Sequence, residues 1–173
     1  MTRCALKSAR PEDDETDMPA ARLDHTFFER EVRPQLGSIL LDKGFVTAEQ
    51  LDRALAERAE KGELLGETLV RLGYVFEEDL ARVLAEQAGV PYMNLGAVDV
   101  DRYAAAVVPR QLGETLVVLP VRFTPEGALV IAVADPTDEA LMRRLATEIN
   151  CPIVLNVAAA SCIRAGWRRT PAA

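Results

Sequence analysis

The chain has 173 residues, of which 49% are hydrophobic, a proportion typical of a globular protein. Its formal net charge of −7 disfavours a nucleic-acid polymer as partner, because proteins that bind such polymers carry basic patches. No apolar run approaches the roughly 20 residues that span a bilayer, and the N-terminus lacks the apolar core of a signal peptide. We therefore expect a cytoplasmic protein without membrane insertion.

Residues 1–33 form a first segment in which the acidic run Glu12–Asp17 is not accompanied by periodic apolar residues. That composition predicts a disordered acidic leader, because it cannot bury enough apolar surface to offset the entropy of ordering. The only histidine, His25, lies in this leader. The three cysteines have no metal-ligand spacing, so we expect neither a metal site nor a disulfide framework.

The next segment, residues 34–89, contains two similar copies of one sequence at an offset of 29 residues, as from Gly37 to Gly66. A fixed period of this kind indicates a repeated supersecondary unit. In each copy a glycine separates two helical patterns, and Thr47 with Gln50 predicts a capping box at the second helix of the first copy. We interpret the segment as a tandem-repeat helical subdomain.

From residue 90 the helical period gives way to short apolar runs with Pro and Gly between them. Helical patterns follow some of these runs, and the last helix is expected to be capped by Ser161. The three strands predicted for the sheet are 116–123, 129–134 and 152–157, and the apolar run 90–95 is also typical of a strand. The predicted helices are 99–107, 109–114, 139–148 and 161–169. The predicted fold class is α+β: a duplicated helical-hairpin subdomain, then a small α/β subdomain at 90–168 with a short three-stranded sheet, and a tail at 169–173.

No motif in the chain supports catalysis. The sequence contains no G-x-x-x-x-G-K-[ST] phosphate loop and no G-x-G-x-x-G after a strand, and serine catalysis would need a histidine outside the leader. Asp135 and Asp138 flank a predicted helix start, where capping explains them. We predict that the chain is not an enzyme and needs no cofactor.

The repeat places a Leu-Gly pair, Leu36-Gly37 and Leu65-Gly66, in the first turn of a helix in each copy. Unsatisfied backbone N–H groups lie there, and a glycine lets a phosphate approach them closely. Two such ends could hold a ligand with two equivalent phosphates. The alternative, which spacing alone favours, is that the glycines allow close helix packing and the leucines fill a core.

Both copies resemble the N-terminal domain of type II secretion and type IV pilus assembly ATPases, the GspE/PilB family, also called the MshEN domain. The resemblance continues through Val90–Leu95, Leu119-Pro120, Leu129–Ala134 and Ala134–Asp138, and covers about residues 35–165. It implies a domain that docks a motor ATPase onto its inner-membrane platform and that, in many members, binds cyclic di-GMP.

The family motif begins with Arg-Leu-Gly and ends with Gln in each copy. This chain departs from it at three positions, with Gln35 and Leu64 in place of the arginines and Arg58 in place of the first glutamine. Glutamine reproduces the bidentate contacts of an arginine fork poorly, and leucine does not reproduce them. The residues that the resemblance implies for cyclic di-GMP binding are Gln35, Leu36, Gly37, Leu51, Leu55, Arg58, Leu65, Gly66, Leu80, Leu84 and Gln87.

Two hypotheses about function follow. The first is a stand-alone, non-catalytic module that contacts a secretion or pilus machinery protein or a motor ATPase, and lies peripheral to the inner membrane through that partner. The second is a working cyclic di-GMP receptor whose ligand controls such a contact. The sequence has no room for the ATPase, so we expect either a stand-alone relative or a truncated product, and the composition of the leader and of the tail favours a complete short protein.

Overall fold

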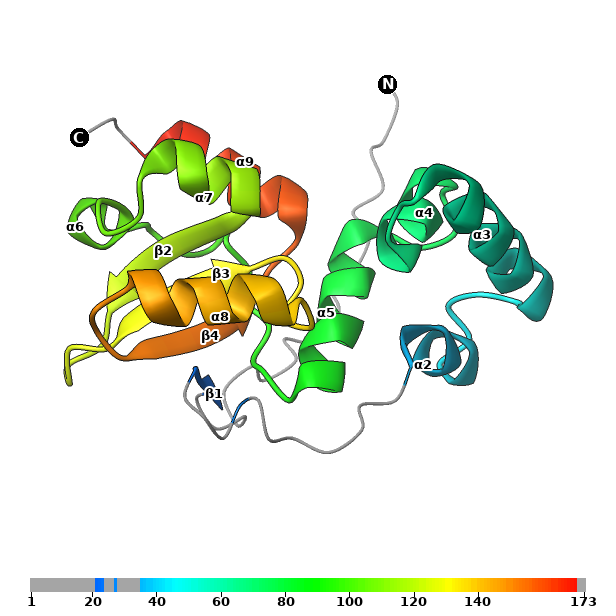
Figure 1. Cartoon of the computed structure of the whole chain (residues 1–173), viewed down its shortest axis with the longest axis horizontal. Coiled ribbons are helices and arrows are strands. Elements are labelled where there is room, and N and C mark those ends of the chain that lie inside the picture. Colours follow the sequence, from blue (N-terminus) through cyan, green and yellow to red (C-terminus); the bar gives the residue numbers. More distant parts are fainter. Residues whose placement is uncertain (1–20, 24–26, 28–34, 171–173) are drawn as a thin grey trace, which may run out of the picture.

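A computed structural model describes residues 21–23, 27 and 35–170 of the chain. Within these residues the elements run β1, α2–α7, β2, β3, α8, β4 and α9. Figure 1 shows helices α2–α4 at one end of the molecule, the sheet with its covering helices at the other, and α5 between them. The rest of the predicted leader lies outside the described residues.

The first repeat consists of α2 (Leu36–Asp42) and α3 (Ala48–Lys61). The predicted capping box is present at the start of α3: Gln50 N–H donates to Thr47 Oγ1 at 3.3 Å, and Thr47 N–H donates to Gln50 Oε1 at 2.9 Å. Two backbone donors at the helix start are thereby satisfied, which explains why α3 begins where the sequence predicts.

The second repeat consists of α4 (Leu65–Arg71) and α5 (Glu77–Ala88). Phe76 stands at the N-cap of α5 without a side-chain hydrogen bond, and the acidic first turn of α5 favours the helix through its dipole instead. The buried core that the two repeats share is itself duplicated. Its members pair at the repeat offset: Leu40 with Leu69, Val46 with Val75, and Ala54 with Val83.

The sheet has the order β1-β4-β3-β2. The three predicted strands are present as β2 (Val118–Phe123), β3 (Leu129–Val133) and β4 (Ile153–Val157). β2 and β3 form an antiparallel hairpin, and β3 pairs with β4 in parallel across α8 (Glu139–Glu148).

A fourth strand corrects the predicted leader. Residues 21–23 do not lie apart from the fold, because β1 (Ala21–Arg22) pairs antiparallel with β4, and Leu23 N–H donates to the carbonyl of Ile153 at 3.0 Å. Leu23 and Phe27 are buried in the same core as the sheet. Two apolar side chains in a polar segment were too weak a pattern to predict this strand.

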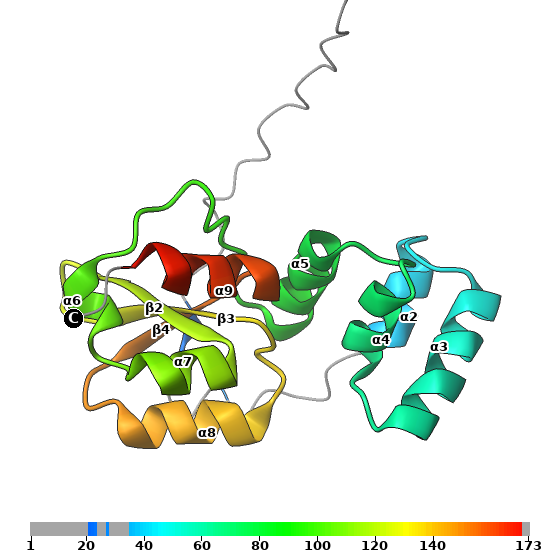
Figure 2. The ribbon, with the colours of Figure 1, turned by 90° about the horizontal axis from the view of Figure 1, so that it is seen from above.

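Both faces of the sheet are buried, which explains the continuous apolar strands. Leu129, Ile131 and Val133 face a core shared with α5 and α8, whereas Val130 and Ala132 face a core shared with α9 (Ala160–Arg169). Figure 2 shows α8 and α9 on opposite sides of the sheet, with α6 (Arg102–Ala105) and α7 (Arg110–Leu116) completing this part. Since α5 contributes to the sheet core and to the repeat core, it joins the two parts.

Three further predictions differ from the structure. Residues 90–95 form no strand and make only an isolated bridge, Tyr92 with Val157, because Pro91 and the following loop interrupt the pairing. α7 extends to Leu116, so β2 begins at Val118 after Val117 turns the chain at a φ of 52°. Ser161 does not cap α9, whose N-cap is Ala159.

Candidate functional site: a cavity between the two repeats

A cavity of about 850 Å³ opens between the helices of the two repeats. This volume lies in the range of sites for small molecules and cofactors. The cavity is lined by all eleven residues that the family resemblance implies for ligand binding: Gln35, Leu36, Gly37, Leu51, Leu55, Arg58, Leu65, Gly66, Leu80, Leu84 and Gln87. Residues spread over 53 positions of the chain therefore meet at one surface.

The lining of the cavity reproduces the sequence repeat. Sixteen of the lining residues form eight equivalent pairs, each separated by the repeat offset: Gln35 and Leu64, Leu36 and Leu65, Gly37 and Gly66, Ser38 and Glu67, Leu41 and Val70, Leu51 and Leu80, Leu55 and Leu84, and Arg58 and Gln87. The two copies thus contribute the same backbone positions, and the side chains differ most at the polar ends of the motif.

The two glycines of the motif pack against leucines of their own copy. A Cβ atom on Gly37 would lie 3.2 Å from Leu51 Cδ2, and one on Gly66 would lie 3.0 Å from Leu80 Cδ2. Close helix packing, one of the two interpretations of these glycines, is therefore present. The same leucines form the apolar floor of the cavity, so the packing role and a binding role do not exclude each other.

Helices α2 and α4 have seven residues each, and neither has a side-chain cap at its N-terminus. Helices of two turns align few peptide dipoles, so side chains must supply most of the contacts to a charged ligand. This finding weakens the expectation that backbone N–H groups at Gly37 and Gly66 hold phosphates unaided.

Arg71, which the sequence did not mark as a candidate, lies in the cavity wall and ties the repeats together. Its Nη2 atom lies 3.0 Å from Glu57 Oε2 and 3.1 Å from Glu63 Oε2. Glu63 also accepts a hydrogen bond from Thr68 Oγ1 at 3.2 Å. In a second ion pair the cation comes from the first copy and the acid from the second: Lys43 Nζ lies 2.8 Å from Glu86 Oε2. Glu86 is the equivalent of Glu57 in the repeat. Reciprocal ion pairs thus connect the two copies.

The hydrogen bond from Arg71 lowers the pKa of the Glu57 carboxyl below its ordinary value. A group whose folded-state pKa is lowered stabilises the fold above its unfolded-state pKa, about 4.3 for glutamate, and loses that contribution as pH falls. Glu57→Gln should therefore weaken the dependence of the urea midpoint on pH between pH 7 and pH 3. Glu60→Gln, on the same helix and exposed, is the control and should leave it unchanged. An unaltered pH dependence in Glu57→Gln would contradict the assignment.

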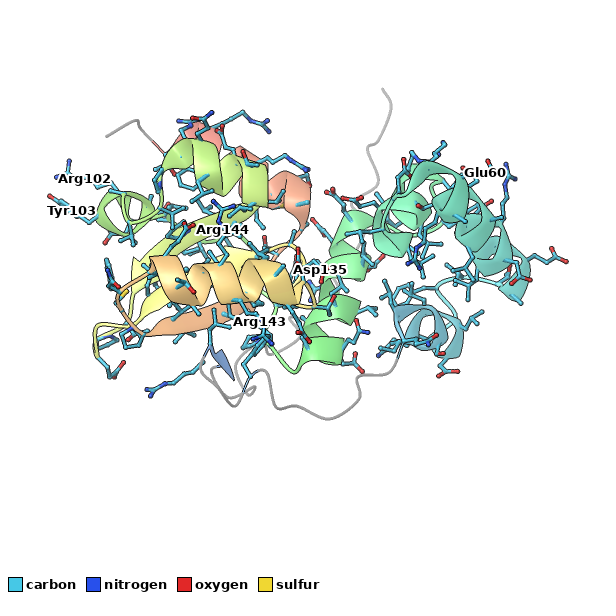
Figure 3. All side chains as sticks on the ribbon, in the orientation of Figure 1. Glu60, Arg102, Tyr103, Asp135, Arg143 and Arg144 are labelled. Atoms are coloured by element: carbon cyan, nitrogen blue, oxygen red, sulfur yellow. The ribbon has the colours of Figure 1, made fainter. Side chains whose placement is uncertain are left out.

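One wall of the cavity comes from the α/β subdomain. It includes Val117, Ala134, Asp135, Thr137, the run 158–160 and Arg164. Glu77 of α5 joins this wall to the repeats, because its Oε2 atom accepts a hydrogen bond from Ser161 N–H at 3.2 Å and so caps α9. Asp135, labelled in Figure 3, accepts a hydrogen bond from Thr137 N–H at 2.8 Å in the turn after β3.

The sequence does not predict this wall, because its residues are distant from the repeat and carry no motif of their own. In the sequence, Arg164, Arg168 and Arg169 form a basic cluster near the C-terminus, a pattern typical of cations that complement a helix C-terminus. Arg168 and Arg169 do lie in the last turn of α9, but Arg164 lies one turn further back and lines the cavity. The spacing of Arg164 and Arg169 places them on different faces of a helix, but it does not show what Arg164 faces.

The described part of the chain contains no group of three or more His, Cys, Asp or Glu side chains placed to hold a metal ion. None of the helices within the described ranges combines the length and apolar character that crossing a membrane requires.

The fold and the cavity define a two-part domain in which a duplicated helical unit packs on a small mixed sheet. Residues 88–172 match the MshEN domain family. No curated protein compared with the chain is significantly similar to it in sequence.

Among solved structures, one of MshE with cdg, which is cyclic di-GMP, is 28% identical, with a TM-score of 0.71 over 80% of this chain and 100% of that one. One of the N-terminal domain of XpsE is 25% identical, with a TM-score of 0.69 over 79% of this chain and 94% of that one. The chain is thus similar to MshEN domains, and the predicted resemblance to the N-terminal domains of secretion and pilus assembly ATPases is confirmed.

Proposed function

We propose that this chain is a non-catalytic regulatory module of a type II secretion, type IV pilus or motility system. It acts in the cytoplasm by contacting a motor ATPase or another protein of the machinery, and reaches the inner membrane through that partner. The similarity to MshE and to the N-terminal domain of XpsE supports this role, because the N-terminal domain of a secretion ATPase is the regulatory part.

The cavity favours a specific means of regulation, the binding of cyclic di-GMP. The observation that carries this proposal is the duplicated lining: equivalent residues from two copies surround a single space, as a ligand with two equivalent halves requires. Paired leucines supply an apolar floor for ribose and base, and Gln35, Arg58 and Gln87 supply polar groups at the ends. MshE, which is similar in fold, was solved with this ligand.

Calorimetric titration tests the proposal. We expect cyclic di-GMP to bind with a Kd of about 1 μM or lower, corresponding to about −8 kcal/mol. Leu55→Glu should weaken binding by at least about tenfold, because it replaces an apolar contact with a charge of the same sign as the phosphates. Leu55 is half-exposed at 41%, so the variant should still fold.

Ala56→Glu is the matched control, because it adds the same charge one residue further along α3 at an exposed position that does not line the cavity. Its affinity should equal that of the unaltered chain. If the unaltered chain binds no cyclic di-GMP at 100 μM (about −5.5 kcal/mol), the ligand proposal is wrong, and regulation through protein contacts alone replaces it.

A further inference from the structure

We propose that Arg164 of α9 binds the ligand of the cavity, so that a bound ligand touches the α/β subdomain as well as the two repeats. The inference rests on the proposed binding of an anionic dinucleotide. It adds a residue from outside the repeat to a site that the repeat builds. Arg164 lines the cavity together with Ala160 of the same helix, one turn nearer its N-terminus.

The cationic side chains of the cavity wall differ in whether they already form ion pairs. Arg71 is held by Glu57 and Glu63, at 3.0 and 3.1 Å, so it serves the link between the repeats. The side chains of Arg58 and Arg164 make no hydrogen bond or ion pair with the residues that the structure describes. These two guanidinium groups are therefore available to a ligand, one from the repeat and one from the α/β subdomain.

The acidic side chains of the cavity wall, with one exception, already accept hydrogen bonds from the protein. Glu63 accepts hydrogen bonds from Arg71 and Thr68, Glu77 caps α9, and Asp135 closes the turn to Thr137. Within the described ranges only Glu67 lines the cavity without such a contact. The available groups, two guanidinium groups and one carboxylate, carry a net positive charge, which favours an anionic ligand.

The backbone that carries Arg164 is held firmly. Ile163 is fully buried, and Trp167 is 3% exposed with its Nε1 atom donating to the carbonyl of Val118 at 2.8 Å. The first turn of α9 is fixed by Glu77, which belongs to the second repeat. A guanidinium on such a helix contacts a ligand at a smaller entropic cost than one on a mobile loop, because only its own side chain must be ordered.

The test is the affinity of the full chain for cyclic di-GMP, measured by calorimetry at two salt concentrations. Arg164→Ala should weaken binding by about tenfold or more, as expected for the loss of a charge-assisted contact, and should reduce the salt dependence of Kd. Arg168→Ala is the matched control: it removes the same charge from the same helix at an exposed position that does not line the cavity. Its Kd should change by less than about twofold.

Arg164→Gln provides a second variant that keeps a polar side chain but shortens it and removes the charge, and it should show a loss similar to that of Arg164→Ala. Equal losses in Arg164→Ala and Arg168→Ala, or no loss in Arg164→Ala, would overturn this inference while leaving the proposed ligand intact. Absence of binding by the unaltered chain would overturn both. A greater loss in Arg164→Ala than in Arg168→Ala, with unchanged melting temperatures, supports the contact.

Discussion

Replacing Gln35 and Leu64 together with arginine is expected to raise the affinity for cyclic di-GMP by about 100-fold. Hydrogen bonds to charged groups contribute about 1.5–3 kcal/mol each, and each 1.4 kcal/mol changes Kd about tenfold. Both residues are exposed, both line the cavity, and both are N-cap residues whose side chains make no capping hydrogen bond. The substitutions therefore place the two arginines of the family motif at these positions without removing a capping hydrogen bond.

A double variant with lysine at the same positions separates charge from geometry. Lysine adds the same net charge but cannot form the bidentate fork, so its gain should fall well below that of the arginine variant. Equal gains would show that only the charge of the cavity matters. If the arginine variant binds no more tightly than the unaltered chain, the side chains at positions 35 and 64 do not reach the ligand. The equivalent positions of the two repeats then do not form the ligand contacts that the family motif implies.

The candidate site could be predicted from the sequence only as far as the repeat extends. A fixed offset forces equivalent residues into equivalent environments, so Leu36 and Leu65, or Leu51 and Leu80, were expected to share a surface, and they do. The α/β wall could not be predicted in this way. Glu77 and Ser161 are 84 residues apart, and their contact follows from how α5 packs on the sheet rather than from any local pattern.

The difference between local sequence patterns and tertiary packing also explains which elements of the fold were predictable. α3 and α8 begin where local capping dictates, with the Thr47–Gln50 box and with Asp138 accepting from Leu141 N–H at 3.0 Å. Residues 90–95 have the apolar composition of a strand, but a strand also needs a partner edge, and only Tyr92 finds one. The capping of α9 by Glu77 likewise depends on tertiary packing, which overrides the serine that local chemistry favours.

Gly113→Ala is expected to lower the free energy of unfolding by about 3 kcal/mol. A Cβ atom on Gly113 would lie 2.3 Å from Trp167 Cζ2, so α7 or the indole ring must move. The ring is buried and bonded to the carbonyl of Val118, and moving it adds an unsatisfied carbonyl to an overpacking cost of about 1–3 kcal/mol. The higher helix propensity of alanine, about 1 kcal/mol, offsets only part of this loss.

A double-mutant cycle with Trp167→Phe assigns the cost to the indole ring. Phenylalanine at position 167 has no atom in the place of Cζ2. It leaves the Val118 carbonyl without its donor whether residue 113 is glycine or alanine, so that penalty cancels. Gly113→Ala should then cost less than about 1 kcal/mol, a coupling of about 2 kcal/mol measured by urea unfolding. An equal cost in the two backgrounds would mean that Gly113 accommodates a different neighbour. A large coupling would show that the contact between α7 and α9 depends on the missing Cβ, and α9 is the helix that presents Arg164 to the cavity.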